Sequence, residues 1–126
     1  MPHCDPVGHI ATPYTSRGDI PRQGFREEIA GTIHLDDRYH ECIRGLEAGI
    51  LIDVIWYAHR ADRTLRRLDD RDVGVFAVRS PARPNPICVS PCRLTAVAGD
   101  RLHVEGVDML DGTPLLDLKP TLRDVD

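Results

Sequence analysis

The segment from Val78 to Pro91, VRSPARPNPICVSP, constrains the fold of this chain more than any other, because it holds four prolines. Proline fixes φ near about −65°, supplies no N–H group and disfavours helical backbone in the residue before it. Ser80 to Pro86 are therefore predicted to form a stiff, extended, non-helical connection between two apolar runs. Together with Arg79, these residues are called the strap below.

The strap carries three polar side chains that suit ligand binding. Arg79, Arg83 and Asn85 have little backbone entropy left to lose, so they are suited to holding a group that is planar and polar, or anionic. The alternative is a rigid surface connection without a ligand.

Length and charge limit what the strap can serve. The 126 residues fit one domain, 1–126, and the formal net charge of −4 gives no general attraction to polyanions. A nucleic-acid contact therefore needs a local basic patch or a partner chain. No apolar run approaches the roughly 18 residues of a membrane span. The first residues, MPHCDPVGHI, lack the features of a signal peptide, so we expect a cytoplasmic protein.

Cysteine spacing indicates reduced thiols. Cys4, Cys42, Cys88 and Cys92 are scattered and form no C-x-x-C pair. The group formed by His3, Cys4 and His9 matches no standard zinc spacing, so no metal site is expected. We expect Cys88 and Cys92 to pack in the core, although a thiol beside the arginines of the strap could instead have a lowered pKa.

Short apolar runs separated by turns predict a mainly β protein. One short helix is expected in DDRYHECIRGLEAG, which opens with Asp36 and Asp37 as capping candidates and closes on Gly49. Gly99 and Asp100 form a two-residue loop of the kind expected for a type II′ hairpin. Strands are predicted at residues 8–12, 29–35, 50–59, 73–78, 87–98 and 101–107.

About six short strands favour a small closed or partly open β-barrel with irregular loops, because closure removes exposed strand edges. In the strand predicted at 50–59, the period of two places four side chains on one face: Asp53, Ile55, Tyr57 and His59. The strand predicted at 73–78 leads directly to Arg79, and functional residues often follow such strand ends.

A second polar loop follows the last predicted hairpin. Asp108, Asp111 and Asp117 surround a DGTP turn, in which Gly112 can adopt positive φ and Thr113 can cap. Read alone, this is a turn between two strands. Beside the arginines of the strap, its acids would suit a ligand that has both cationic and anionic parts.

Four sequence blocks, taken in order, resemble one family. They are IPRQG at 20–24, WYAHRADR at 56–63, GVFAVRSPARPNPI at 74–87 and VEGVDMLDGTPLLDLKP at 104–120. This pattern is similar to that of the TsaA-like family, also called TrmO. The resemblance implies a small β-barrel that forms homodimers and binds S-adenosyl-L-methionine near the subunit interface. It also implies methylation of N6 of threonylcarbamoyladenosine beside the anticodon of tRNA.

The resemblance also implies which residues bind the cofactor. By motif position these are Pro21, Arg22, Gln23, His59, Arg60, Arg79, Val89, Asp108, Met109, Leu110 and Asp111. Methyl transfer from a sulfonium depends mainly on positioning, and no metal is required. An amide-like N6–H must also lose its proton, so Asp111, Asp117 and His59 are the candidate catalytic residues.

Four residues depart from the family pattern, and they leave the methyl acceptor open. They are Val78, Ala82, Cys88 and Thr121; Cys88 stands where glycine is usual, so a side chain occupies a place where backbone would approach a ligand. Three functions therefore remain: a tRNA adenine N6-methyltransferase, a methyltransferase for a small molecule or other nucleophile, and a cofactor-binding module without catalysis.

Binding of tRNA would require local cations in this acidic chain. Two clusters qualify, one formed by Arg17, Arg22 and Arg26 and the other by Arg60, Arg63, Arg66 and Arg67. The alternative for the second cluster is an exposed connection in which the arginines pair with Asp69, Asp70 and Asp72.

Overall fold

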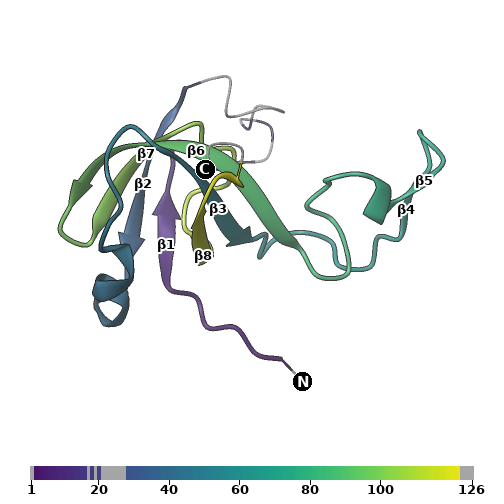
Figure 1. Cartoon of the computed structure of the whole chain (residues 1–126). Coiled ribbons are helices and arrows are strands. Elements are labelled where there is room, and N and C mark those ends of the chain that lie inside the picture. Colours follow the sequence, from purple (N-terminus) through teal and green to yellow (C-terminus); the bar gives the residue numbers. More distant parts are fainter. Residues whose placement is uncertain (1, 17, 19, 21–27, 123–126) are drawn as a thin grey trace.

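A closed six-stranded antiparallel barrel forms the body of the protein, in the order β1-β2-β7-β6-β3-β8 (Figure 1). The computed structural model describes residues 2–16, 18, 20 and 28–122. The closed barrel confirms the prediction of a small β-barrel with one short helix and irregular loops. The barrel strands are β1 (Gly8–Ala11), β2 (Ala30–Leu35), β3 (Leu51–Tyr57), β6 (Ile87–Ala98), β7 (Arg101–Glu105) and β8 (Thr113–Pro120).

Alternation of side chains along the strands fills the barrel. In β3, Ile52, Val54 and Trp56 point inward and are buried. Asp53, Ile55 and Tyr57 lie on the outer face, as the period of two predicted. The strand ends at Tyr57, however, so His59 lies in the following turn and does not continue that face. Apolar residues from all six strands complete the core, including Ile10, Ile33, Leu94, Leu102 and Leu115.

Two local predictions are confirmed at the turns. Ala98 pairs with Arg101, and Gly99 has a φ of 63° whereas Asp100 does not adopt positive φ, which fits a type II′ hairpin. The predicted helix is the 3₁₀ helix η3 (Asp37–Ile43), whose N-cap Asp36 accepts from the Arg38 N–H at 3.0 Å. It is shorter than expected, because Gly45 follows with a φ of 96°.

Residues 58–86 leave the barrel after β3 and return at β6, and we call them the arm. In Figure 1 the arm projects from one side of the barrel. It contains the two-stranded sheet of β4 (Arg67–Leu68) and β5 (Val73–Gly74), the 3₁₀ turn η4 (Val75–Ala77) and the strap. The strand predicted over 73–78 is confirmed only for Val73 and Gly74, which form β5, and was wrong for the residues that follow. The chain has no barrel neighbour here, and the Arg83 guanidinium, rather than a strand, occupies the carbonyls of Val75 and Val78.

Three connections meet at one end of the barrel, which we call the loop end. The register pairs Ala30 with Glu105, Tyr57 with Ile87, and Ile10 with Thr113. In an antiparallel barrel these pairings bring the connections 12–29, 58–86 and 106–112 to the same end. Three of the sequence blocks that resemble the TrmO family, 56–63, 74–87 and 104–120, run through or border these connections, whereas most of the block at 20–24 lies outside the described residues. No helix within the described part of the chain is long and apolar enough to cross a membrane.

Candidate functional site

A chain of hydrogen bonds links the barrel interior to Asp108 at the loop end. Trp56 Nε1–H donates to Ser90 Oγ at 2.9 Å, and the Ser90 hydroxyl donates to Asp108 Oδ1 at 2.5 Å. Burial raises the pKa of Asp108, while the Ser90 hydrogen bond partly opposes this increase. The site therefore contains a half-buried carboxylate whose position is fixed by two buried side chains.

The turn that carries the other predicted acids is fixed to the segment after β1. Thr12 Oγ1–H donates to the Met109 carbonyl at 2.9 Å, and the Thr12 N–H donates to Asp111 Oδ1 at 3.0 Å. The Asp111 N–H in turn donates to the Tyr14 carbonyl at 2.8 Å. Met109 is fully buried, so its side chain is a core anchor for the turn. Asp111 stays exposed and keeps its second carboxylate oxygen at the surface.

The DGTP sequence forms the turn that was predicted for it. Gly112 has a φ of 82°, and Thr113 Oγ1–H donates to the Leu110 carbonyl at 2.6 Å. The Gly112 N–H donates to the Ile10 carbonyl at 2.8 Å, which joins the turn to β1. Hydrogen bonds to β1 and to the segment after it therefore hold the turn in place.

Two of the three polar side chains of the strap have structural partners. The Arg83 guanidinium donates to the carbonyls of Val75 at 2.7 Å, Val78 at 3.1 Å and Ser80 at 3.2 Å. From the other side of the arm, Arg63 donates to the Pro84 carbonyl at 2.9 Å and to Asn85 Oδ1 at 3.3 Å. All three side chains were expected to hold a ligand. Arg83 and Asn85 instead stabilise the strap through these hydrogen bonds.

Arg79 differs from these two residues. It is exposed, and within the described part of the chain it makes no hydrogen bond or ion pair. Of the polar side chains predicted in the strap, Arg79 therefore keeps its guanidinium available for a ligand.

Cys88 lies between the strap and the turn. Burial raises the pKa of its thiol to about 11, with Arg83 and Arg79 acting in the opposite direction and Asp108 reinforcing the shift. The strap leads into β6, where Ser90 follows Cys88 by two residues and its hydroxyl donates to Asp108, so the fold brings the strap and the turn together beside Cys88. The alternative of a lowered thiol pKa is wrong for Cys88, and for Cys92, whose pKa burial raises to about 12. All four cysteines are free, as predicted.

The remaining predicted residues lie on the rim and the outer wall. His59 and Arg60 are exposed in the turn after β3. Val89 and Asp117 both lie opposite Ile55 on the outer face of the barrel, one on β6 and the other on β8. Asp117 also forms an ion pair with Lys119 at 3.0 Å. The structure therefore separates Val89 and Asp117 from the inward-facing carboxylate of Asp108. Pro21, Arg22 and Gln23 lie outside the described residues.

Sequence reasoning missed Ser90 and Trp56. The signal was present, since strand periodicity puts both residues on the inner face, where a polar atom requires a partner. What the sequence lacked was the identity of that partner, because Asp108 comes from a loop beyond the next strand.

The arginine cluster of the arm is largely occupied by local partners. Arg67 pairs with Asp72 at 2.7 Å and with Asp69 at 3.3 Å, and Arg66 donates to the Arg63 carbonyl at 3.0 Å. The alternative of an acid-paired connection is therefore confirmed for Arg67. Arg17, Arg22 and Arg26 lie outside the described residues. Over residues 2–16, 18, 20 and 28–122, no group of three or more His, Cys, Asp and Glu side chains could hold a metal ion.

Comparisons with known proteins show which family the chain resembles. Residues 9–126 match the family described as tRNA-methyltransferase O N-terminal domain. The chain is 42% identical over 122 residues to a probable S-adenosyl-L-methionine-binding protein of Halobacterium salinarum, covering 95% of this chain and 98% of that protein. It is 48% identical over 134 residues to the tRNA (adenine(37)-N6)-methyltransferase of Mus musculus, covering 97% of this chain but 31% of the mouse protein.

Solved structures of TrmO resemble the fold of this chain. A crystal structure of TrmO superposes with a TM-score of 0.87 at 35% identity, covering all of this chain (100%) and 60% of that one. The TrmO structure from Pseudomonas aeruginosa gives a TM-score of 0.83 at 34% identity, covering 97% of this chain and 56% of that one. This chain thus spans less than two thirds of either solved TrmO chain. The chain therefore belongs to the tRNA-methyltransferase O family of S-adenosyl-L-methionine-dependent methyltransferases.

Proposed function

We propose that this protein methylates N6 of threonylcarbamoyladenosine beside the anticodon of tRNA. The observation that carries the proposal is that the strap leads into β6, where the Ser90 hydroxyl donates to Asp108 of the 108–113 turn at 2.5 Å, at the loop end of the barrel. The mouse relative, named as a tRNA (adenine(37)-N6)-methyltransferase, supports tRNA as the methyl acceptor.

The residues at the loop end fit S-adenosyl-L-methionine, which supplies the methyl group. The cofactor carries a carboxylate, two cationic centres, a ribose diol and an adenine ring, so its site needs a donor, acids and apolar surface together. Arg79 offers an exposed guanidinium, and Asp108 offers a half-buried carboxylate fixed by Ser90. Cys88 and Leu110 add half-buried apolar surface between them.

Proton removal from the acceptor nitrogen requires a base at the rim of this site. We propose Asp111 and His59, since both are exposed at the loop end and Asp111 is held in place by the Thr12 N–H. Asp117 is the weakest of the three candidates, because Lys119 already pairs with its carboxylate on the outer wall.

The proposed active form is a homodimer in which the arm packs against a second copy. Phe76 on the arm is 83% exposed, and Ile87 and Val89 on the outer face of β6 are 48% and 38% exposed. Exposed apolar side chains on the projecting arm, and on the strand that the arm leads into, suit burial against a partner.

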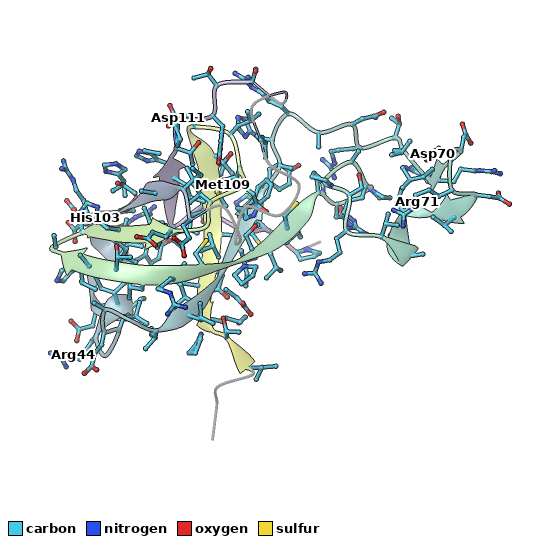
Figure 2. All side chains as sticks on the ribbon, turned by 90° about the horizontal axis from the view of Figure 1, so that it is seen from above. Arg44, Asp70, Arg71, His103, Met109 and Asp111 are labelled. Atoms are coloured by element: carbon cyan, nitrogen blue, oxygen red, sulfur yellow. The ribbon has the colours of Figure 1, made fainter. Side chains whose placement is uncertain are left out.

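Methyl transfer to tRNA tests this proposal. The protein is incubated with labelled S-adenosyl-L-methionine and total tRNA, and the tRNA is digested to nucleosides. We expect label only in methylated threonylcarbamoyladenosine, and loss of that label in Arg79→Ala. Arg71→Ala, an exposed arginine at the far end of the arm (Figure 2), is the matched control and should keep full activity.

Two outcomes would contradict the proposal. Label in a small molecule and none in tRNA would indicate another methyl acceptor. Tight cofactor binding without transfer to any acceptor would indicate a binding module without catalysis.

A further inference from the structure

Three histidines and an arginine share one outer face of the barrel, and we call them the histidine patch. His9 on β1 lies opposite His34 on β2, and His34 lies opposite Arg101 on β7. The rings of His9 and His34 are stacked, with centroids 4.8 Å apart and planes 9° from parallel. His103 lies on the same face of β7, opposite Thr32, with Nδ1 3.4 Å from Thr32 Oγ1.

One edge of the histidine patch, at His9, borders the loop end, whereas His34 and Arg101 pair at the other end of the β2–β7 ladder from Ala30 and Glu105. His9 also lies opposite Pro114, the residue that follows Thr113 at the start of β8. Asp111, a proposed base, raises the pKa of His34, whereas the neighbouring His9, Arg101 and His103 lower it. A shallow groove of about 280 Å³ runs beside the patch, lined in part by Thr12, Pro13, Thr32, His103 and Glu105. In Figure 2, His103 and Asp111 lie on the barrel, away from Asp70 and Arg71 at the far end of the arm.

The patch stands out because many other cations of this acidic chain already have carboxylate partners. Arg38, Arg44, Arg67 and Lys119 each pair with an acid. Arg101, in contrast, is exposed and makes no hydrogen bond or ion pair with any residue the structure describes. The histidine patch therefore combines an available guanidinium with three imidazoles on one face.

This combination suits single-stranded RNA. Unpaired bases stack on aromatic side chains, histidine among them, with little dependence on which base is bound, while arginine binds phosphate. We propose that the histidine patch is the surface on which the anticodon loop of the tRNA substrate docks, with bases against His9 and His34 and phosphate at Arg101. The inference rests on the proposed function and assigns its substrate to a particular face of the barrel.

Docking on histidines gives RNA binding a specific pH dependence. Burial lowers the pKa of His34 below its ordinary value near 6.5, as do the neighbouring His9, Arg101 and His103, whereas Asp111 raises it. His34 is therefore mostly neutral near pH 7, where its ring can stack on a base but carries no charge to attract phosphate. A bound phosphate raises the pKa of His34 in the complex, so RNA binding takes up a proton. The affinity rises as the pH falls from above the pKa of His34 in the complex to below its pKa in the free protein.

Filter binding of tRNA at constant salt tests the patch. The variants are the triple substitution H9Q/H34Q/H103Q and, separately, Arg101→Gln. His3→Gln, an exposed histidine in the N-terminal segment, is the matched control. At about pH 6 we expect the triple variant to bind tRNA about tenfold more weakly and to lose most of the tightening between about pH 8 and pH 6. Arg101→Gln should lower the slope of log affinity against log salt by about 1.

Two further measurements separate this inference from the proposed function. Calorimetric titration with S-adenosylhomocysteine should give unchanged affinity in all four proteins. In the transfer reaction the triple variant should raise KM for tRNA with little change in kcat. The docking role of the patch alone would be wrong if the patch variants matched the wild type in tRNA affinity, salt slope and KM while the wild type still methylated tRNA. If the wild type neither binds nor methylates tRNA, the proposed function and the patch both fall.

Discussion

The barrel and the arm are stabilised by different interactions, although both belong to one short chain. The barrel buries apolar side chains from all six strands, including Ile10, Ile33 and Leu102, each with no exposed area. The arm, over 29 residues from 58 to 86, buries only Val75 and Pro86. It depends instead on prolines and on arginine-to-carbonyl bonds such as those of Arg83. The barrel can therefore fold on its own core, whereas the arm presents a stiff surface with little core of its own.

The largest expected effect comes from the barrel. Leu102→Ala removes a fully buried side chain on β7 and should lower the free energy of unfolding by about 2–5 kcal/mol, because it leaves a cavity in the core. Val97→Ala is the matched control, since Val97 lies opposite Leu102 but is 40% exposed. Urea unfolding followed by tryptophan fluorescence measures both variants. Equal, small effects in the two would mean that the barrel core does not dominate stability.

An intermediate effect, on association rather than folding, is expected from the arm. Phe76 is 83% exposed, so Phe76→Ala should change the unfolding free energy by no more than about 0.5 kcal/mol. If the arm packs against a second copy, the same change should weaken dimerisation about tenfold or more, because an exposed aromatic side chain becomes an interface anchor. Sedimentation over a dilution series measures the dimer constant.

The control for Phe76 is Leu122→Ala, which truncates another exposed apolar side chain, 80% exposed and outside the arm. It should leave association unchanged. A monomeric wild type, or equal dimer constants in all three proteins, would remove the proposed role of the arm.

The sequence predicted the barrel better than the arm for a physical reason. Strand periodicity reports burial, so the alternation of Ile52, Val54 and Trp56 correctly located the inner face of β3. In the arm, VGVFAV has the composition of a strand, but only Val73 and Gly74 pair with a neighbouring strand, and Arg83 binds the carbonyls of Val75 and Val78. Such a long-range replacement leaves no periodic signal in the sequence.

The site shows the same division. Its loops were located from short motifs whose turn geometry is local, such as Gly112 with its φ of 82°. The hydrogen bonds from Trp56 to Ser90 and from Ser90 to Asp108 cross 34 and 18 residues of sequence, so no local pattern could predict them. The division of the arginines into structural and available groups depended on contacts of the same kind.

The smallest expected effect on stability lies at Asp108, in the connection between β7 and β8 at the loop end. Burial raises the pKa of this carboxyl in the folded state above its ordinary value of 3.8, so the folded state binds the proton more tightly than the unfolded state. The contribution of Asp108 to stability is therefore fully present below pH 3.8 and is lost as the pH rises through its folded-state pKa. Asp108→Asn removes this titration, while the amide oxygen can still accept from Ser90.

The variant should consequently be slightly more stable than the wild type at neutral pH, with the difference disappearing as the pH falls below 3.8. Its affinity for S-adenosyl-L-methionine should fall about tenfold, because a charge-assisted contact becomes a neutral one. Thermal unfolding across a pH series and calorimetric titration measure the two effects on the same samples. Ser90→Ala is the informative companion, since it leaves the buried carboxylate without its donor and should destabilise the protein. A loss of stability in Asp108→Asn with cofactor affinity unchanged would make Asp108 a structural residue of the barrel end and move the cofactor site toward Arg79 and the strap.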